Sequence, residues 1–458
     1  MSQYVPDTAA PVPIERYEQL VAYFESACKP RSEWRIGTEY EKVAVRRCDG
    51  RAVPFSGAHG IEAVLRDLAE RYRWQPVLEG DRVVALAGPR AAITLEPGGQ
   101  LELSGEKCDN IHCAERELNE HIEQIITVAE RHEIAFLGLG MQPVSRPDEI
   151  ECVPKQRYRI MGPYMRRVGT LGQRMMKQTA TVQVNIDFGS EADAVMKMRV
   201  GMGIGSLLNA MFANSPISDG RLNGYLSYRG HIWTDTDPRR CGLLPFVFQP
   251  EWGFRDYAEY ALDVPMYFIV RDGVWHDMTH LSFRRFWQEG YLGHRATMAD
   301  WNAHLTTLFP ETRLKGYIEL RSVDSQQPEL MLAVPALAKG VFYDADGLRA
   351  AWDLVRDWSW EERLELWHAG HRQGLQARVR GRSLRELAAE LLAIAVAGLE
   401  GQRQLDPQGE DESIHLERLQ ELVDRGVSPA DLLIEQWNGA WGGEIHRLIE
   451  NRAYRRAA

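Results

Sequence analysis

The clearest pattern in the chain is an alternation of apolar and polar residues that predicts four strands. Residues 181–188 read Thr-Val-Gln-Val-Asn-Ile-Asp-Phe, with an apolar side chain at every second position. Residues 36–45 and 317–321 repeat this pattern, and residues 92–104 predict a strand broken by a Pro-Gly-Gly kink. Because successive side chains of a strand point to opposite sides, each strand should pack one face and present the other.

The polar faces of these strands carry acids, amides and arginine more than lysine, threonine or serine. Their members are Glu39, Glu41, Glu96, Gln100, Glu102, Gln183, Asn185, Tyr317, Glu319 and Arg321. One such strand is an ordinary half-solvated antiparallel strand, and the Pro-Gly-Gly stretch alone could be an exposed hairpin edge. Four such strands together favour a single sheet face that carries the catalytic residues. Clustered carboxylates on that face would suit a hard cation such as Mg²⁺. Whether the four strands are neighbours decides between these interpretations.

Periodic apolar positions predict helices around the strands. Helices are expected at residues 14–29, 60–73, 111–133 and 155–177, and from Ser190, which forms a capping pair with Asp193, to about residue 213. Shorter strands are expected at residues 135–140, near 225–233 and 244–248, and at 264–270. Strands mixed with long helices, in no βαβ rhythm, favour an α+β fold with an antiparallel sheet.

After about residue 345 the pattern becomes almost entirely helical. Residues 383–386 form a capping box, Ser-Leu-Arg-Glu, and Ser428 followed by Pro429 opens a further helix. The polar stretch at 402–412 is short, which argues against a tethered module. We therefore expect a single catalytic domain over residues 1–458, with a sheet-containing core at 14–345 and a helical layer at 346–458 packed on it.

Composition narrows the functional classes. The 458 residues are 44% hydrophobic and 26% charged, as in an ordinary soluble globular protein. The net charge is −11 and no basic stripe stands out, so no nucleic-acid partner is expected. No apolar run reaches 18 residues, so no membrane span is expected. Residues 1–13 show no leader pattern, which favours a cytoplasmic location.

The six cysteines are scattered and form no Cys-x-x-Cys motif, so they are expected to stay reduced. Cys108 and Cys113 could in principle reach one another. A zinc site from this pair and His112 is disfavoured because no second ligand pair follows at zinc spacing. The chain also lacks a P-loop, a Rossmann glycine fingerprint and a nucleophile elbow.

Several long motifs, in order along the chain, resemble glutamate–cysteine ligase of the plant and proteobacterial type. They occupy residues 35–42, 95–105, 181–185, 211–216, 231–237, 262–268 and 304–321, with weaker likeness at 437–442. The resemblance implies a glutamine-synthetase-like fold with one twisted, mostly antiparallel sheet surrounded by helices. It also implies the first step of glutathione synthesis, in which ATP drives ligation of L-glutamate to L-cysteine through γ-glutamyl phosphate. Mg²⁺ is the implied metal, with Mn²⁺ as an alternative, and the chain would act as a monomer or homodimer.

Residue by residue, the resemblance implies a metal site and a substrate site. The implied metal ligands are Glu39, Glu41, Glu96, Glu102 and Glu319. Arg229 and Arg321 match arginines near the acyl phosphate, where a planar guanidinium fork stabilises spread negative charge. These two arginines and five further residues are expected to contact nucleotide or substrate: Gln100, Gln183, Asn185, Trp233 and Tyr267. Plant members also carry a cysteine pair in the stretch corresponding to 271–302, which has no cysteine here, so that crosslink is not expected.

Alternatives remain for individual residues and for the function. Glu319 and Arg321 could form only a surface salt bridge of little energetic value. Trp233 could be a packed indole beside an Asx-rich turn, and Tyr267 could belong to the core. A ligase of this fold could join glutamate to an amine other than cysteine, since a small pocket discriminates by only ~1–3 kcal/mol per methylene. A non-catalytic binding protein that keeps the fold is the remaining alternative.

Overall fold

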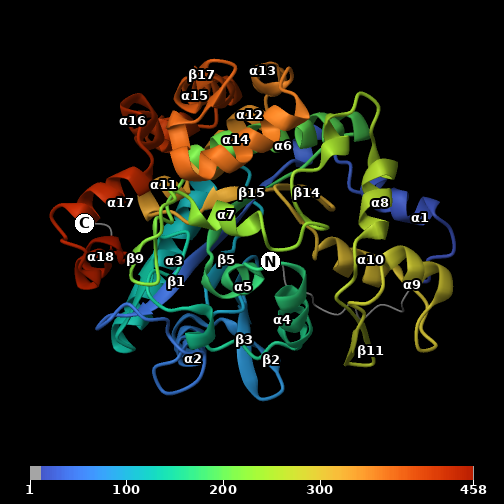
Figure 1. Cartoon of the computed structure of the whole chain (residues 1–458), viewed down its shortest axis with the longest axis horizontal. Coiled ribbons are helices and arrows are strands. Elements are labelled where there is room, and N and C mark those ends of the chain that lie inside the picture. The colour runs from blue at the N-terminus through green and yellow to red at the C-terminus, as the bar shows by residue number, and fades with distance from the viewer. Residues whose placement is uncertain (1–11, 457–458) are drawn as a thin grey trace.

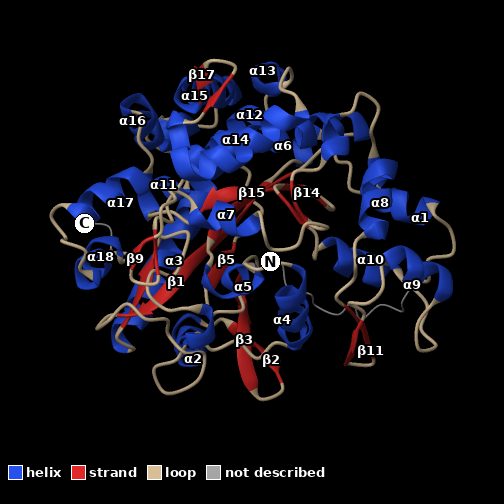
Figure 2. Cartoon of the chain, viewed as in Figure 1, coloured by secondary structure: helices blue, strands red, loops and turns tan. Residues whose placement is uncertain are grey.

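The centre of the protein is one twisted, nine-stranded sheet with helices on both faces (Figures 1 and 2). The computed structural model describes residues 12–456. The strand order is β14-β15-β7-β1-β5-β4-β3-β2, with β6 paired to β1, and all of these pairings are antiparallel. The strands are β1 (Ile36–Arg46), β2 (Gln75–Glu79), β3 (Arg82–Ala87), β4 (Ala92–Leu95), β5 (Leu101–Ser104), β6 (Ile134–Leu137), β7 (Thr181–Ile186), β14 (Thr312–Leu314) and β15 (Ile318–Asp324).

The four strands with acidic or amide faces are neighbours in this sheet, in the order β15-β7-β1-β5 with β4 following. Glu39 lies opposite Gln183 on one side and Ser104 on the other, and Glu41 lies opposite Glu102. Directly opposed residues of antiparallel strands point to the same face. The polar side chains therefore share one face, while Tyr40, opposite Val182 and Leu103, belongs to the other.

Helices cover the apolar face because that face buries valine, isoleucine and leucine side chains. They are α2 (Ile61–Tyr72), α3 (Ile111–Arg131), α6 (Glu191–Met211) and α12 (Ala333–Phe342), packed against β3, β6, β15 and β7 respectively. Over the polar face lie α4 (Gln156–Val168), α5 (Gly172–Gln178) and α7 (Tyr228–Trp233). The polar face is thus enclosed as well, and its acids are buried rather than solvated.

Two further groups of elements flank the sheet. One group joins α1 (Glu18–Glu25), α8 (Phe254–Asp263), α9 (Phe283–Glu289) and α10 (Met298–Leu305) to the hairpin of β11 (Phe268–Arg271) and β12 (Val274–Asp277). The carboxy-terminal group contains α13 (Ala345–Val355), α14 (Trp360–Gln373), α15 (Leu384–Gln402), α16 (Glu417–Arg425), α17 (Pro429–Asn438) and α18 (Ile445–Arg452). Of these, α13 and α14 pack on α6, and α15 packs on α12.

Short elements complete the chain. They are α11 (Pro328–Met331), the 3₁₀ turns η1 (Arg31–Glu33), η2 (Pro147–Glu149), η3 (Pro245–Phe248), η4 (Gly374–Gln376) and η5 (Glu412–Leu416), and the strands β8 (Ile217–Ser218), β9 (Arg221–Leu222), β10 (Cys241–Gly242), β13 (Phe309–Pro310), β16 (Arg378–Val379) and β17 (Arg382–Ser383). Within residues 12–456, no helix is long and apolar enough to span a bilayer.

The predicted α+β fold with one mostly antiparallel sheet is confirmed, and four local predictions need correction. The stretch 155–177 forms two helices, α4 and α5, because the chain becomes extended at Gly169. The segment near 225–233 is helix α7, because the side chain of Ser227 caps it by accepting from the Gly230 N–H at 3.0 Å. The segment near 244–248 is the 3₁₀ turn η3, with Pro245 at its first position. The stretch 92–104 forms two paired strands, since the Pro-Gly-Gly kink is a full reversal of the chain.

Candidate active site

Three buried carboxylates from two strands and a turn meet on the polar face. One oxygen each from Glu41, Glu96 and Glu102 lies within 4.8 Å of the others, and we call this cluster the acid triad. Glu41 and Glu102 face each other across β1 and β5. Glu96 follows β4 and joins them because the chain turns back at once, with the Gly99 N–H donating to the Glu96 carbonyl at 2.9 Å.

The turn that positions Glu96 and Glu102 is held by the side chain of Gln100. Its Oε1 accepts from the Gly98 N–H at 2.9 Å, and its Nε2 donates to the carbonyl of Thr179 at 2.8 Å. Both ends of this amide are therefore engaged by backbone groups of the turn and of the segment after α5. These contacts give Gln100 a positioning role and leave its predicted ligand contact without structural support.

The acid triad is electrostatically crowded. Burial, followed by the charges of Glu96 and Glu102, raises the pKa of the Glu41 carboxyl well above its usual value. The nearby ammonium of Lys155 donates to the Leu95 carbonyl at 2.9 Å, and burial lowers its pKa to about 8 against the attraction of Glu96. Clustered carboxylate oxygens that repel one another are the donor set of a hard divalent cation. The residues present therefore fit Mg²⁺ or Mn²⁺.

A cluster of opposite character surrounds Glu319, and we call it the cationic cluster. Its carboxylate contacts Arg313 at 2.6 Å, Arg321 at 2.6 Å and Lys315 at 3.2 Å. Burial alone raises a carboxyl pKa, but these three charges hold the pKa of Glu319 well below its usual value. All four side chains are at most 6% exposed, so the alternative of a surface salt bridge is excluded. Three cations around one carboxylate suit an anionic ligand better than a metal ligand at Glu319.

Two amides of β7 lie along this face, and one of them, Gln183, connects the two clusters. The Gln183 Nε2 donates to Glu41 at 3.5 Å, while its Oε1 accepts from Arg321. The Asn185 Nδ2 donates to Glu39 at 3.4 Å. The sheet face therefore carries a continuous polar row from carboxylates to cations, as the alternation pattern predicted.

Helix α7 brings Arg229 and Trp233 to this face. Asp324 fixes the helix because its carboxylate accepts from Ser227 at 2.9 Å. The Arg229 Nη2 donates to the carbonyl of Arg321 at 2.9 Å, and the Arg321 guanidinium lies 5.7 Å from the Trp233 ring centroid. Burial lowers the pKa of Arg229, with the charges of Asp324 and Glu41 opposing the shift. The structure thus places Arg229, Trp233 and Arg321 together.

Tyr267 has different surroundings. It is 1% exposed, its ring centroid lies 4.0 Å from the Arg240 guanidinium, and its hydroxyl contacts the Met165 sulfur at 3.7 Å. Arg240 in turn pairs with Asp237 at 2.6 Å. These contacts match the alternative in which Tyr267 belongs to the core, and its predicted substrate contact has no support among them.

Sequence reasoning missed Arg313, Lys315 and Lys155. Arg313 and Lys315 flank Leu314 on β14 and its turn, and Arg313 pairs directly with Glu319 across the strands. Their alternation around Leu314 was a usable signal in a strand of only three residues. Lys155 lies at the N-cap of α4, where no sequence pattern distinguishes it from a surface lysine.

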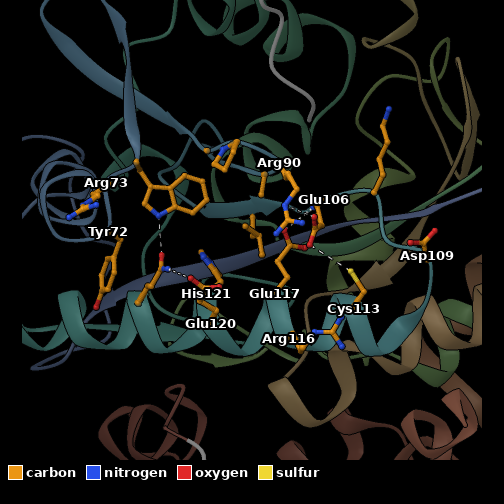
Figure 3. A pocket seen from close by; sticks show the side chains of 17 residues that line it. Tyr72, Arg73, Arg90, Glu106, Asp109, Cys113, Arg116, Glu117, Glu120 and His121 are labelled. Atoms are coloured by element: carbon orange, nitrogen blue, oxygen red, sulfur yellow. Dashed lines mark hydrogen bonds and ion pairs between the residues drawn. The ribbon is translucent and has the colours of Figure 1, made fainter. Parts of the chain in front are cut away.

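Two cavities lie on opposite sides of the sheet. A cavity of about 300 Å³ on the polar side is lined by Glu39, Asn185 and Tyr317, with Lys29, Arg35 and Lys107 among its other residues. A cavity of about 760 Å³ lies beside α3, where Cys113, Glu117 and His121 line it (Figure 3). Leu103 also lines this cavity, and because it is adjacent to Glu102 on β5 its side chain lies on the opposite face of the sheet. The larger cavity is therefore on the face opposite the acid triad.

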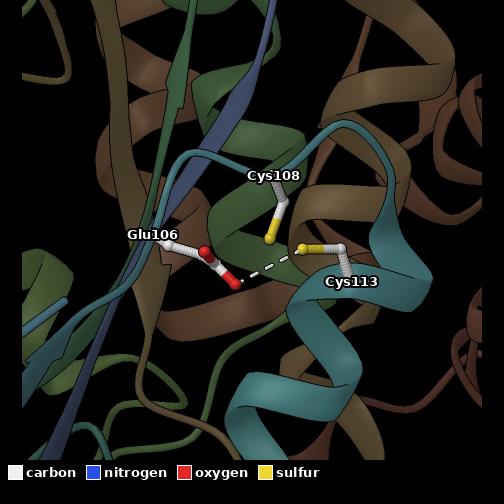
Figure 4. A group of neighbouring side chains, drawn as sticks. All are labelled: Glu106, Cys108 and Cys113. Carbon is white, nitrogen blue, oxygen red and sulfur yellow. Dashed lines mark hydrogen bonds between the residues drawn. The ribbon is translucent and has the colours of Figure 1, made fainter. Parts of the chain in front are cut away.

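The thiols of Cys108 and Cys113 do approach one another, beside Glu106 (Figure 4). The Cys113 sulfur lies 3.6 Å from the Glu106 carboxylate, and all six cysteines of the chain are free. Burial, followed by the neighbouring thiol of Cys113, raises the pKa of Cys108. Burial also raises the pKa of Cys113, so both thiols of the pair favour the protonated form.

The family profile and the curated relatives both identify the glutamate–cysteine ligase family. The sequence profile of glutamate-cysteine ligase family 2 matches residues 35–451. The chain is 43% identical over 441 residues to the chloroplastic glutamate–cysteine ligases of Brassica juncea and Arabidopsis thaliana, covering 95% of this chain and 84% and 83% of those proteins. A crystal structure of a glutamate–cysteine ligase from Francisella tularensis in complex with AMP shares the fold, with a TM-score of 0.53 at 14% identity over 93% of this chain and 90% of that one.

These relatives correct one expectation. A cytoplasmic location was expected from residues 1–13, but the relatives from Brassica juncea and Arabidopsis thaliana are chloroplastic. Residues 1–11 lie outside the described part of the chain. A location is set by short targeting segments, whereas the matched residues form the folded domain, so composition near residue 1 was a poor guide.

Proposed function

Because this chain belongs to glutamate-cysteine ligase family 2, we propose that it joins the γ-carboxylate of L-glutamate to the amine of L-cysteine at the expense of ATP. The products are γ-glutamylcysteine, ADP and phosphate, and the reaction is the first step of glutathione synthesis. The observation that carries the proposal is the acid triad beside the cationic cluster on one enclosed sheet face. The small-molecule substrates are the proposed partners, and a monomer or homodimer is the proposed assembly.

The two clusters suit the first half of the reaction, transfer of a phosphoryl group to the γ-carboxylate. A carboxylate is a weak nucleophile, and it must approach an anionic phosphate. Glu41, Glu96 and Glu102 would hold Mg²⁺, which when bound supplies charge neutralisation between phosphate oxygens. Glu39 lies two residues from Glu41 on the same face, about 7 Å along the strand, and would extend this ligand set.

Arg321 is oriented to bind the transferring group. Among residues 12–456, the side-chain hydrogen bonds of Arg321 all use Nη1, which contacts Glu319 and Gln183. The edge formed by Nε and Nη2 can therefore offer two parallel donors to a planar anion. Arg229 adds a second buried positive charge 3.9 Å from Asp324. Together they would stabilise negative charge as the γ-glutamyl phosphate forms.

In the second half, the cysteine amine attacks the γ-carbon of γ-glutamyl phosphate. A carbon–nitrogen bond forms, the carbon–oxygen bond to phosphate breaks, and the amine loses a proton. The enclosure of the polar face by α4, α5 and α7 would exclude water, which would otherwise hydrolyse the acyl phosphate. The cationic cluster then stabilises the phosphate as it leaves.

We place the nucleotide in the cavity of about 300 Å³ on the polar side. Glu39 lines this cavity and lies on the same strand face as Glu41, so a nucleotide there would direct its phosphates toward the acid triad. Lys29, Arg35 and Lys107 give the cavity positive charge, although Lys29 also contacts Asp187 at 2.6 Å. This placement accounts for the predicted contact of Asn185.

The proposal is tested by measuring phosphate release with ATP, Mg²⁺, glutamate and cysteine omitted one at a time. Phosphate release should require ATP, Mg²⁺ and glutamate, and it should rise strongly when cysteine is added. A panel of amines, including 2-aminobutyrate and alanine, then tests acceptor choice. Turnover that is unchanged in EDTA or without glutamate would refute the ligase. Higher turnover with another amine than with cysteine would instead favour a ligase with a different acceptor.

A further inference from the structure

A second group of metal-binding side chains lies where the carboxy-terminal helical layer meets α3. His112 and Glu115 are three residues apart on the first turns of α3, so they lie on one helix face. His415 comes from η5, more than three hundred positions away in sequence. One ligand atom of each residue lies within 4.8 Å of the others. We propose that His112, Glu115 and His415 form a binding site for a transition-metal ion of the zinc class.

The spacing of the two imidazoles fits coordination better than a hydrogen bond. The His112 Nδ1 and the His415 Nε2 are 3.4 Å apart. Hydrogen bonds from nitrogen donors are usually about 2.7–3.2 Å long. Two nitrogens at ~2.0–2.1 Å from a tetrahedral zinc ion lie about 3.3–3.4 Å apart. The observed separation therefore equals the edge of a zinc coordination tetrahedron, without any movement of the rings.

The orientation of His112 leaves its Nδ1 as the nitrogen that can bind a metal. Its Nε2 lies 3.3 Å from the carbonyl oxygen of Gln404, which can only accept. The proton of the neutral ring is therefore assigned to Nε2, and the Nδ1 lone pair points toward His415. Metal-bound histidines commonly donate their second nitrogen to a carbonyl in this way, which fixes the tautomer and the ring orientation.

The elements that carry the ligands are already docked to one another. Glu412 of η5 accepts from the Ile111 N–H, at the start of α3, at 2.6 Å. The same carboxylate pairs with the buried ammonium of Lys339 on α12. His415 follows Glu412 by three residues, so this buried contact sets its distance from His112. A site on such preorganised elements binds a metal without the cost of ordering a loop.

The chemical class of the ion follows from the donors. Two imidazole nitrogens and one carboxylate oxygen suit Zn²⁺, Co²⁺ or Ni²⁺, whereas Mg²⁺ prefers the all-oxygen acid triad. A fourth position is left for water. The bound ion would join the core helix α3 to the carboxy-terminal layer, and it would stabilise the folded state because the three ligands are together only there. The site is separate from the proposed active site and its existence does not depend on the proposed function.

The test uses the full chain, stripped with EDTA, dialysed, and kept in saturating Mg²⁺ so that the acid triad is occupied. Addition of Co²⁺ should give the visible absorption of a tetrahedral nitrogen–oxygen site, and Zn²⁺ should bind at one equivalent in calorimetry and raise Tm by several degrees. His415→Ala and Glu115→Gln should weaken Zn²⁺ binding by at least ten-fold and abolish the Tm shift. Phosphate release should stay unchanged, since neither residue belongs to the proposed active site.

Two control variants separate this site from others. His446→Ala removes an exposed histidine that contacts Glu444 at 3.2 Å, and Cys113→Ser removes a thiol of the cysteine pair. Both should bind Zn²⁺ as the unmodified protein does. If His415→Ala also binds Zn²⁺ normally, or if the unmodified protein binds none in saturating Mg²⁺, the proposal is overturned and the two rings form only a long hydrogen bond. Loss of binding in Cys113→Ser alone would assign the metal to the thiols and overturn it equally.

Discussion

At the scale of single residues, the environment of a charge decides what it can do. Glu102 and Glu319 are both 0% exposed and both lie on the polar face of the sheet. Glu102 faces two other carboxylates, whereas Glu319 faces three cations. The first group offers oxygen ligands to a divalent cation, and the second can accept an anion. An ATP-dependent ligase requires both kinds of site within reach of one substrate.

Glu102→Gln keeps the size of the side chain and removes a charge from the acid triad. If the triad holds the metal, kcat should fall by roughly 10²-fold or more. The Tm measured in EDTA should not fall, because the substitution relieves repulsion among buried carboxylates. The control is Glu70→Gln, which removes the same charge from an exposed position on α2 and should leave both quantities unchanged. Normal activity of both Glu102→Gln and Glu96→Gln would contradict the metal role.

Arg321→Lys keeps the net charge and removes the planar fork. Lysine can still pair with Glu319, but it cannot offer two parallel donors, so kcat should fall by roughly 10–100-fold. Stability should change little, because Glu319 keeps Arg313 and Lys315. Steady-state assays and thermal unfolding check the two expectations, with the exposed Arg349→Lys as control. Full activity of Arg321→Lys would show that Arg321 acts only as a counter-charge for Glu319.

The residues of the acid triad were predictable from sequence because strand alternation fixes their face. Glu41 and Glu102 follow the period of two, as does Glu39 beside them, whereas Glu96 lies in the turn after β4 and is placed by the chain reversal. The partner of Gln100 was not predictable, because it is a backbone carbonyl after α5 that is distant in sequence, and the partners of Glu319 on β14 left only a weak signal in a strand of three residues. Neither propensity nor periodicity specifies such contacts; the family resemblance named the residues but not their surroundings.

At the scale of elements, the Pro-Gly-Gly turn between β4 and β5 determines the position of Glu96 in the acid triad. A Cβ on Gly98 would lie 2.1 Å from the Lys177 carbonyl oxygen, which is a backbone atom and cannot rotate away. The following residue, Gly99, has a φ of 83°, in the region that favours glycine. The turn can therefore approach the end of α5 only without side chains, and this close approach places Glu96 beside Glu102.

Gly98→Ala should disturb both stability and activity. Overpacking of this kind costs about 1–3 kcal/mol, and displacement of Glu96 should lower kcat and weaken the Mg²⁺ dependence of turnover. The matched control is Gly401→Ala in α15, where a Cβ meets nothing within 4 Å and alanine favours the helix. Thermal unfolding and a Mg²⁺ titration of turnover measure the effects. Equal behaviour of the two variants would show that the turn tolerates a wider spacing.

The starts of several helices were predictable from local capping residues, whereas short elements were not. The capping boxes at Ser383 and Ser428 are present in the structure, and Ser190 caps α6. The helix α7 was mistaken for a strand because its six residues are too few for a helical period to emerge. The strands β2 and β3 were not predicted, since β3 is buried through its centre and carries no alternation.

At the scale of the whole molecule, the buried neutral histidines set the response to acid. His304 is 3% exposed and its Nε2 contacts the Ala261 carbonyl at 2.8 Å. Burial, and then the charge of Arg240, lowers its pKa to about 3. His371, 1% exposed, has its pKa lowered to about 3 by burial and by the charges of His368, His231 and Arg229. Both rings remain uncharged in the folded protein at pH values where the unfolded chain binds protons.

Each of these histidines should therefore destabilise the folded state as the pH falls below 6.5. The unfolded chain gains a proton near pH 6.5 and the folded state does so only near pH 3, so each ring costs about 1.4 kcal/mol for every pH unit in between. His304→Gln keeps a donor for Ala261 but cannot titrate. Its stability deficit relative to the unmodified protein should shrink by about 2 kcal/mol between pH 7.5 and pH 5. Urea unfolding across this range measures the difference, with the exposed His446→Gln as control. Parallel stability curves for His304→Gln and the unmodified protein would show that His304 takes up its proton at an ordinary pKa.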